Sequence, residues 1–195
     1  MKNKLFLMLF CLATLTSNCQ SKSTDFKCKE LFRKYKEKNS ASEVDSARYY
    51  INSAMKCAPE NTNFINNSIQ FYIKVADYKA AISQVEKLKG SDGDKSLSFM
   101  ISVLKLKDGS ISAKNDLRKL YEEYKNDKQL SSTNVIYKIT LDNYFNNKEF
   151  ALAQIKKYQK IYNSEYDVQN LEAIKNLIVT LNKEKVLFSL FNIKN

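Results

Sequence analysis

The chain of 195 residues contains no histidine, and this absence limits the chemistry that it can perform. Histidine is the commonest general base in enzymes, it activates serine and cysteine nucleophiles, and it is a frequent metal ligand. Ser-His and Cys-His catalytic pairs and histidine-based metal sites are therefore excluded. We expect no catalytic residue, no bound metal and no other cofactor, and thus a binding protein rather than an enzyme.

Glycine and proline are scarce as well, with three glycines and one proline in the whole chain. A sheet-rich fold of this length needs more residues suited to tight turns, whereas helices continue with few forced breaks. With 44% hydrophobic residues, the chain is long enough for one domain with a continuous core. The composition therefore predicts an all-α fold.

The first part of the chain has the pattern of an export signal. Lys2 and Lys4 are followed by an apolar run from Leu5 to Leu15. The run has the length of a signal-peptide core and is too short to span a bilayer. We therefore treat this part separately from the fold, and we expect the rest of the chain to occupy an oxidising compartment.

Small and polar residues and then Cys19 follow the run, and this sequence resembles the lipobox of bacterial lipoproteins. In that family the cysteine is acylated on its sulfur and becomes the mature N-terminus. The resemblance implies a cleaved signal peptide over residues 1–18, lipidation of Cys19 and a tether over residues 19–25. The implied location is the bacterial cell envelope, with a lipid anchor in the outer membrane and the domain facing the periplasm. Plain secretion, with cleavage near Cys19, is the alternative.

The formal net charge is +11, and it becomes +9 when residues 1–18, which contain two lysines and no acid, are removed. A basic surface favours anionic partners such as lipid headgroups, acidic polysaccharide or acidic peptide, and the export signal disfavours nucleic acid. Lysines far outnumber arginines, however. AT-rich coding DNA is therefore an alternative explanation of the charge, because arginine is the better residue for phosphate recognition.

Two segments, one starting at Val44 and the other at Tyr78, have small or apolar residues at the same offsets. The first continues with Ala47, Ile51 and Ala54, and the second continues with Ala81, Val85 and Leu88. A period of about 34 residues indicates an array of helical hairpins, each of which needs a neighbour to bury its apolar face. Helical periodicity extends this pattern to five hairpins. Their helices are expected at residues 26–38 and 42–56, 63–75 and 79–89, 97–107 and 111–126, 135–145 and 149–162, and 167–181 and 184–193.

Small residues and a proline follow the turn in the first hairpin. They are Ala47, Ala54 and Pro59, which come after the turn residue Val44. In the spacing of these residues the segment resembles the second helix and exit turn of a tetratricopeptide repeat. Over residues 26–193, the resemblance implies an α-solenoid of about five helical hairpins. The corresponding turn residues of the five hairpins are Val44, Tyr78, Ser110, Phe150 and Val186.

In tetratricopeptide arrays the first helix of each hairpin lines a concave groove. Carried over by offset from the turn residues, this groove is predicted to contain Lys29, Arg33, Lys36, Asn63, Asn66, Gln70, Lys95, Ser98, Ser102, Lys105, Lys138 and Asp142. Most of these side chains are polar donors, which suit an extended peptide with acidic groups. An ordinary hydrated surface is the alternative interpretation.

Two cysteines lie in the expected first hairpin, Cys28 near the start of its first helix and Cys57 at the end of its second. These two ends are neighbours in an antiparallel pair, so we favour a disulfide between Cys28 and Cys57 over two buried thiols. We also expect Ser40 or Ser42 to cap the second helix of this hairpin.

The last expected helix is apolar on nearly every side, whereas the terminal helix of a repeat array usually has a polar outer face. Its apolar residues include Val186, Leu187, Leu190 and Phe191. The helix either buries itself against the preceding hairpin or docks into a partner or a second copy.

These observations favour an envelope lipoprotein that binds a protein or peptide partner of unknown identity in a helical groove. One alternative is an accessory subunit of an outer-membrane assembly machine, which the apolar last helix would favour. The other is a protein that binds anionic glycan or lipid through its basic surface.

Overall fold

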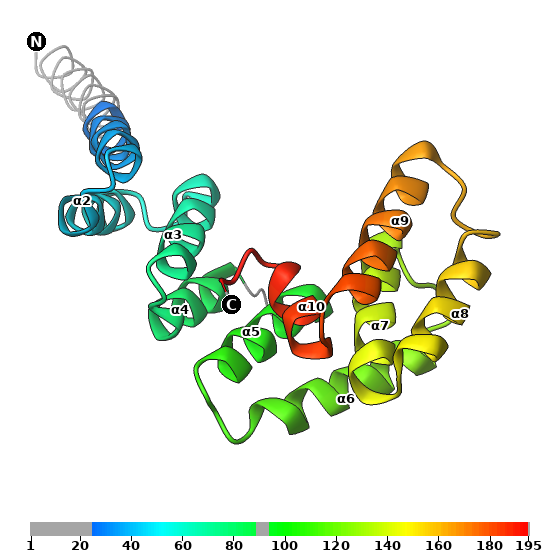
Figure 1. Ribbon diagram of the computed structural model, residues 1–195. Helices are drawn as coiled ribbons and strands as arrows, with labels where there is room; N and C mark the ends of the chain where they lie inside the picture. Colours follow the sequence, from blue (N-terminus) through cyan, green and yellow to red (C-terminus); the bar gives the residue numbers. More distant parts are fainter. Residues whose placement is uncertain (1–24, 89–93, 195) are drawn as a thin grey trace, which may run out of the picture. The chain divides into compact units, whose positions relative to one another are not determined.

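The computed structural model describes residues 25–88 and 94–194. Throughout these two ranges every regular element is a helix, as predicted from the composition (Figure 1). The expected signal peptide and Cys19 lie outside the described residues. None of the helices in the described part of the chain combines the length and the apolar character needed to span a membrane.

A helix over residues 25–40 precedes nine labelled helices. These are α2 (Val44–Cys57), α3 (Thr62–Lys74), α4 (Tyr78–Leu88), α5 (Lys95–Lys107), α6 (Ala113–Asn126), α7 (Ser132–Phe145), α8 (Lys148–Tyr158), α9 (Glu165–Thr180) and α10 (Lys183–Ser189). The largest differences from the expected bounds are at the ends of α8 and α10. Each of these helices ends four residues early and continues as hydrogen-bonded turns, for example from the Tyr162 N–H to the Tyr158 carbonyl.

The chain divides after Ser68, inside α3, into two compact units, which we call unit 1 and unit 2. In unit 1 a disulfide joins Cys28 to Cys57, with their Cα atoms 5.5 Å apart. Beside it, the ring of Phe32 stacks on that of Phe64 at 4.5 Å between centroids. The disulfide connects the two helices of the first hairpin, and the ring contact connects its first helix to α3.

The first helix of each of the first three hairpins ends in the same kind of turn. Ser42, Ala76 and Gly109 have positive φ values of 59°, 57° and 79°. The next residue in each case donates its N–H to a carbonyl five residues earlier, which defines a Schellman motif. These bonds are Glu43 to Lys38 at 3.0 Å, Asp77 to Tyr72 at 2.9 Å and Ser110 to Lys105 at 2.9 Å. The two intervals between the positive-φ residues agree, to within one residue, with the interval from Val44 to Tyr78, so the turn repeats at nearly the period read from the sequence.

One predicted cap is wrong. The N-cap of α2 is Glu43, whose side chain makes no capping hydrogen bond, rather than Ser40 or Ser42. The reason is the turn itself, because Ser42 takes the left-handed conformation that ends the preceding helix.

Two of the three left-handed positions carry residues with a Cβ atom, which this conformation disfavours. We expect Ala76→Gly to raise the free energy of unfolding by about 1 kcal/mol, since glycine adopts positive φ without a steric penalty. Urea-induced unfolding followed by circular dichroism measures the change.

Two substitutions serve as controls for this prediction. A Cβ at Gly109 would meet no atom within 4 Å, so Gly109→Ala tests the backbone alone and should lose about 1–2 kcal/mol. Ala80→Gly, inside α4, should lose about 1 kcal/mol. A loss of stability in Ala76→Gly would contradict the role assigned to the left-handed turn.

In unit 2, consecutive helices from α4 to α9 contact one another along the chain. The helix with the most partners is α7, which contacts α5, α6, α8, α9 and α10. A core cluster forms between α7, α8, α9 and α10. Its buried members are Val135, Ile139, Ala151, Ile155, Leu171, Ile174, Ile178 and Val186.

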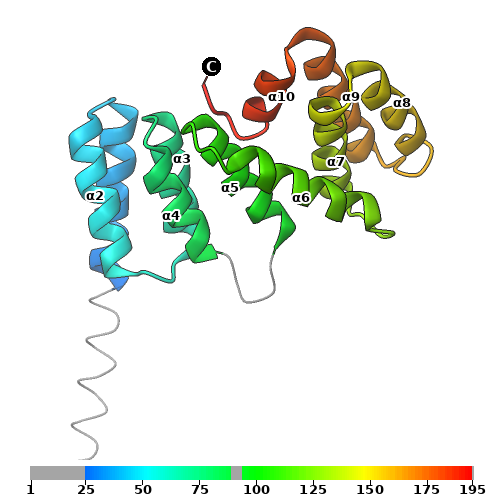
Figure 2. The ribbon, with the colours of Figure 1, turned by 90° about the horizontal axis from the view of Figure 1, so that it is seen from below.

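The last helix folds back over earlier parts of unit 2. It contacts α7, α9 and α5, and Figure 2 shows it in red beside α9. Of the two outcomes considered for this helix, burial within its own chain is therefore the observed one. The prediction did not include contacts of this helix with α5, α7 and α9, each of which is the first helix of a hairpin.

Candidate functional site

In unit 1 the predicted groove residues are exposed. Lys29, Arg33 and Lys36 lie on the helix over residues 25–40, and Asn63 and Asn66 lie on α3. The Phe32–Phe64 contact and a hydrogen bond from the Tyr35 hydroxyl to the Asn67 carbonyl, at 3.2 Å, hold these two helices together. A polar surface is thus presented by two first helices, with apolar side chains beneath it.

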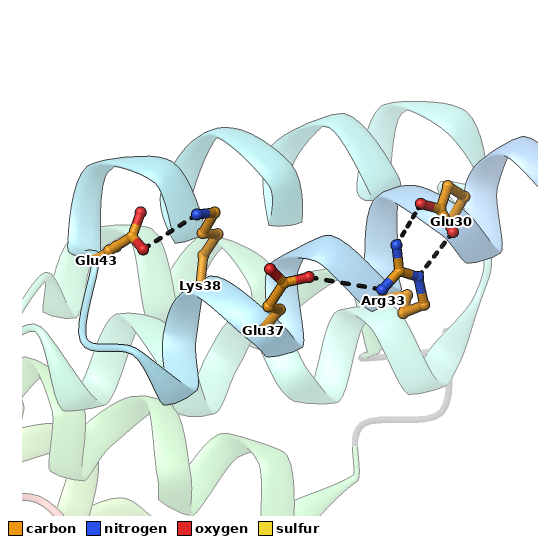
Figure 3. A network of polar contacts seen from close by, with 5 residues as sticks. All are labelled: Glu30, Arg33, Glu37, Lys38 and Glu43. Carbon is orange, nitrogen blue, oxygen red and sulfur yellow. Dashed lines mark hydrogen bonds and ion pairs between the residues drawn. The ribbon is translucent and has the colours of Figure 1, made fainter.

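Two of the three cations of this surface, Arg33 and Lys29, are paired with acids on their own helix. Arg33 donates to both carboxylate oxygens of Glu30 at 2.9 and 2.7 Å, and its guanidinium lies 3.5 Å from Glu37 (Figure 3). The bond from Arg33 lowers the pKa of Glu30 below its ordinary value. Lys29 is paired in the same way with Asp25 at 2.6 Å. An acidic ligand must compete with these carboxylates, so charge alone is a poor basis for binding here.

In unit 2 the predicted groove residues do not form one exposed surface. Gln70 is exposed, but Lys95 pairs with Asp127 at 2.7 Å and Lys105 pairs with Asp116 at 3.2 Å. Ser102 is buried, and its hydroxyl donates to the Ser98 carbonyl at 2.9 Å.

A cleft of about 260 Å³ does lie between α5 and α6. Ser98, Ser102 and Lys105 line it from α5, and Asp116 and Lys119 line it from α6. Its lining contains both basic and acidic side chains, and Lys105 and Asp116 neutralise each other in an ion pair. The cleft therefore offers no preference for an acidic ligand.

Lys138 and Asp142 were predicted to line the groove, and the structure shows that they do not. Both are buried, with exposed fractions of 9% and 0%, and the Lys138 ammonium donates to the Asp142 carboxylate at 2.8 Å. The other carboxylate oxygen accepts the Tyr121 hydroxyl at 2.7 Å, and this hydroxyl accepts the Asn146 amide at 2.7 Å. Burial and the bond to Asp142 raise the pKa of Tyr121 to about 12. Tyr121, Lys138 and Asp142 thus form a buried polar network, with the exposed Asn146 at its edge, rather than a binding surface.

On α5, the error in the predicted groove comes from the choice of turn residue. Val44 and Tyr78 each lie two residues after the left-handed residue of their turn, and the equivalent after Gly109 is Ile111 rather than Ser110. A shift of one residue rotates a helix by about 100°. The offset therefore selected the wrong side of α5.

Neighbouring residues on α5 and α7 contact α10 and the residues that follow it. The Phe191 ring lies 5.7 Å from that of Phe99 on α5 and 6.0 Å from that of Tyr137 on α7. The Lys107 ammonium lies 4.8 Å from the ring centre of Phe188. We call the side of α5 and α7 that these residues mark the inner face of unit 2. The sequence signal for it was aromatic residues at positions 99 and 137, one residue beyond Ser98 and one before Lys138.

The predicted partner helix needs a correction as well. Val186 and Leu187 have no exposed surface, so they cannot present a docking site on the outside of the protein. Leu190 and Phe191 are partly buried. The apolar character of the segment is explained by its contacts within unit 2.

Among the described residues, no group of three acidic or cysteine side chains is arranged to hold a metal ion. Comparison of the chain with protein-family models, curated proteins and solved structures finds no match.

Proposed function

We propose that this chain is a helical-repeat scaffold, anchored in the bacterial cell envelope through a lipid on Cys19, that binds a protein or peptide. Each unit has its own binding surface, formed in unit 1 by the helix over residues 25–40 and the part of α3 up to Ser68, and in unit 2 by α5, α7 and α9. In this proposal the chain carries out no chemical reaction. Its role is to hold a partner at the membrane surface.

The observation that carries the proposal is the position of α10. This short apolar helix lies against α5, α7 and α9, which are all first helices of hairpins. The side of these helices thus accommodates a polypeptide segment within the chain itself. A groove that binds helices or extended peptides uses the same kind of surface.

The repeating turn supports an α-solenoid of the tetratricopeptide kind. Left-handed residues recur at positions 42, 76 and 109, and each is followed directly by the second helix of a hairpin or by the turn that leads into it. Consecutive helices of unit 2 contact each other, as a stack of hairpins requires. The recurrence of this turn in the backbone supports the repeat proposed from the residue pattern.

In the described part of unit 1 the first helices are polar and are not covered by a segment such as α10. Lys36 and Asn66 have exposed side chains with hydrogen-bond donors, which suit the carbonyl groups of an extended peptide. The pairing of Arg33 and Lys29 with acids argues against the alternative of a purely electrostatic site for glycan or lipid. The burial of Val186 and Leu187 removes the feature that favoured an assembly-machine subunit.

Site-specific crosslinking in intact cells tests the proposal. A photoreactive amino acid at position 36 or 66 should form an adduct with a distinct partner protein, identified by mass spectrometry. The matched control is position 49 on α2, where Tyr49 is 65% exposed on a second helix of the same unit. Adducts at position 49 equal to those at positions 36 and 66, or none at all three, would overturn the proposal.

Fractionation of the same cells tests the anchor. Cys19→Ser removes the sulfur that would carry the lipid, so the variant should leave the membrane fraction. Retention of the variant in the membrane fraction would contradict lipidation at Cys19.

A further inference from the structure

We infer that residues 188–194 are an internal ligand of the inner face of unit 2, and that an external helix with two aromatic side chains three residues apart displaces them. The inference rests on the proposed function, because both assign binding to the first helices of the hairpins. It adds the chemical class of the partner and a competition that controls access to the site.

The C-terminal segment divides into two halves that contact different helices. In the first half, Val186 belongs to the core cluster with α7, α8 and α9, and Leu187 has no exposed surface. In the second half, Phe188 and Ile193 are buried, Leu190 packs against the edge of the same cluster, and Phe191 is only partly buried. The first half is thus held within the cluster, whereas the rings of Phe188 and Phe191 reach Lys107, Phe99 and Tyr137 on α5 and α7. In the proposal, these ring contacts are the part that exchanges with another ligand.

Contacts of the second half with the inner face are made by side chains rather than by directional bonds. Phe191 meets Phe99 and Tyr137 through its ring, and Phe188 meets the Lys107 ammonium. Within the described part of the chain, no hydrogen bond links a side chain of residues 188–194 to a different helix. Exchange for another apolar helix therefore leaves no buried polar group unsatisfied.

Residues 188–194 also indicate which kind of ligand the inner face of unit 2 binds. Phe188 and Phe191 are three residues apart, so both point to the same side of one helical turn. A Schellman turn at Asn192, with φ of 55°, ends the segment and places Ile193 at 3% exposure. The matching partner is a short helix with two aromatic anchors at this spacing, which is the helix-in-groove mode of peptide recognition.

Covalent attachment gives the internal segment an advantage over any free helix. A tethered ligand competes at an effective concentration of roughly millimolar order. An external helix of equal affinity must reach that concentration, whereas a better helix or a weakened internal segment lowers the requirement. The C-terminal segment thus sets a threshold that a partner has to exceed.

The absence of tryptophan from the chain provides a clean reporter for the test. In Phe191→Trp, all tryptophan emission comes from the position in contact with Phe99 and Tyr137. The probe is an unlabelled synthetic peptide with the sequence of residues 183–194. We expect the probe to shift the emission to longer wavelength as residue 191 is expelled into water. Adding Phe188→Ala to the variant should lower the midpoint concentration about tenfold, since it weakens only the internal competitor.

Two controls accompany the titration. A peptide with serine in place of both phenylalanines should leave the emission unchanged. Ile111→Trp, at a site that is 97% exposed, should be insensitive to either peptide. Far-ultraviolet circular dichroism checks that each variant is folded. If tryptophan at position 191 prevents folding, Phe191→Leu is used instead, and binding is measured by competition with a labelled peptide.

Several results would overturn the inference. One is a tryptophan emission typical of water before any peptide is added to Phe191→Trp. Another is an emission that stays constant at millimolar peptide, with and without Phe188→Ala. A third is a shift with the serine peptide equal to that with the natural sequence. An emission that changes with protein concentration alone would identify a second copy of the chain as the occupant instead. If displacement fails while the adducts at positions 36 and 66 persist, the proposed function stands without this partner class. If displacement succeeds without adducts, the proposed function fails in unit 1 alone.

Discussion

Replacing Asp142 with alanine should lower the free energy of unfolding by about 3–5 kcal/mol, the largest loss that we expect from one substitution in this chain. The carboxylate has no exposed surface, and it accepts both the Lys138 ammonium and the Tyr121 hydroxyl. Its removal leaves a cation and a hydroxyl in the interior without their acceptor, and the cost of desolvating them is no longer offset. Urea-induced unfolding with a check that the slope is unchanged measures the loss.

The matched control removes both charges together. Lys138→Met with Asp142→Leu keeps similar volumes and leaves no buried ion, so the double variant should lose far less than Asp142→Ala alone. Adding Tyr121→Phe removes the hydroxyl that would otherwise lack an acceptor, and it should recover about 1 kcal/mol of the remaining loss. Equal losses in the single and double variants would show that the pair does not act as a unit.

The network also explains why α7 looked like a groove helix from its sequence. Lys138 and Asp142 stand four residues apart, which is typical of an ion pair on an exposed helix surface. In the structure the same spacing is used inside the protein, because α7 is surrounded by α5, α6, α8, α9 and α10. No local pattern distinguishes these two environments. The number of helices that surround α7 depends on the return of α10, far along the chain.

Local features of the fold were predictable for a physical reason. Helical periodicity and scarce glycine fixed most helices to within a few residues, because each helix is stabilised by its own amphipathic spacing. The turn between α5 and α6 illustrates the limit. Gly109 and Ser110 are both acceptable turn residues in a sequence, and only the backbone shows which one takes the left-handed conformation. This ambiguity of one residue was enough to select the wrong side of α5.

The path of α10 was not predictable from the same information. Its apolar residues indicated burial, and the structure places them against α7, α9 and α5. A repeat pattern predicts that a helix packs on its sequence neighbour, which here would be α9 alone. The additional contacts of Phe191 with Phe99 and Tyr137 depend on shape complementarity between distant segments. Periodicity carries no information about such contacts.

Unit 1 should lose about 3–4 kcal/mol of stability when Cys28 and Cys57 are both replaced by serine. The bridge joins positions with a sequence separation of 29, and without it the unfolded chain regains the entropy of that loop. Unit 1 has few helices to compensate. Hydrogen exchange of its backbone amides measures the loss directly, because it reports the stability of each region separately.

Two comparisons distinguish the stabilisation due to the disulfide bond from that due to packing of the cysteine side chains. A reducing agent should lower protection in residues 25–57 of the natural chain to the level of the double variant, and it should have no effect on the variant itself. Amides of α8 and α9, in the other unit, should keep their protection in both cases. A loss that appears only in the variant would mean that the sulfur atoms stabilise unit 1 by packing. A loss caused by reduction would instead show that this hairpin needs an oxidising compartment for its stability, which is the kind of compartment that the proposed export provides.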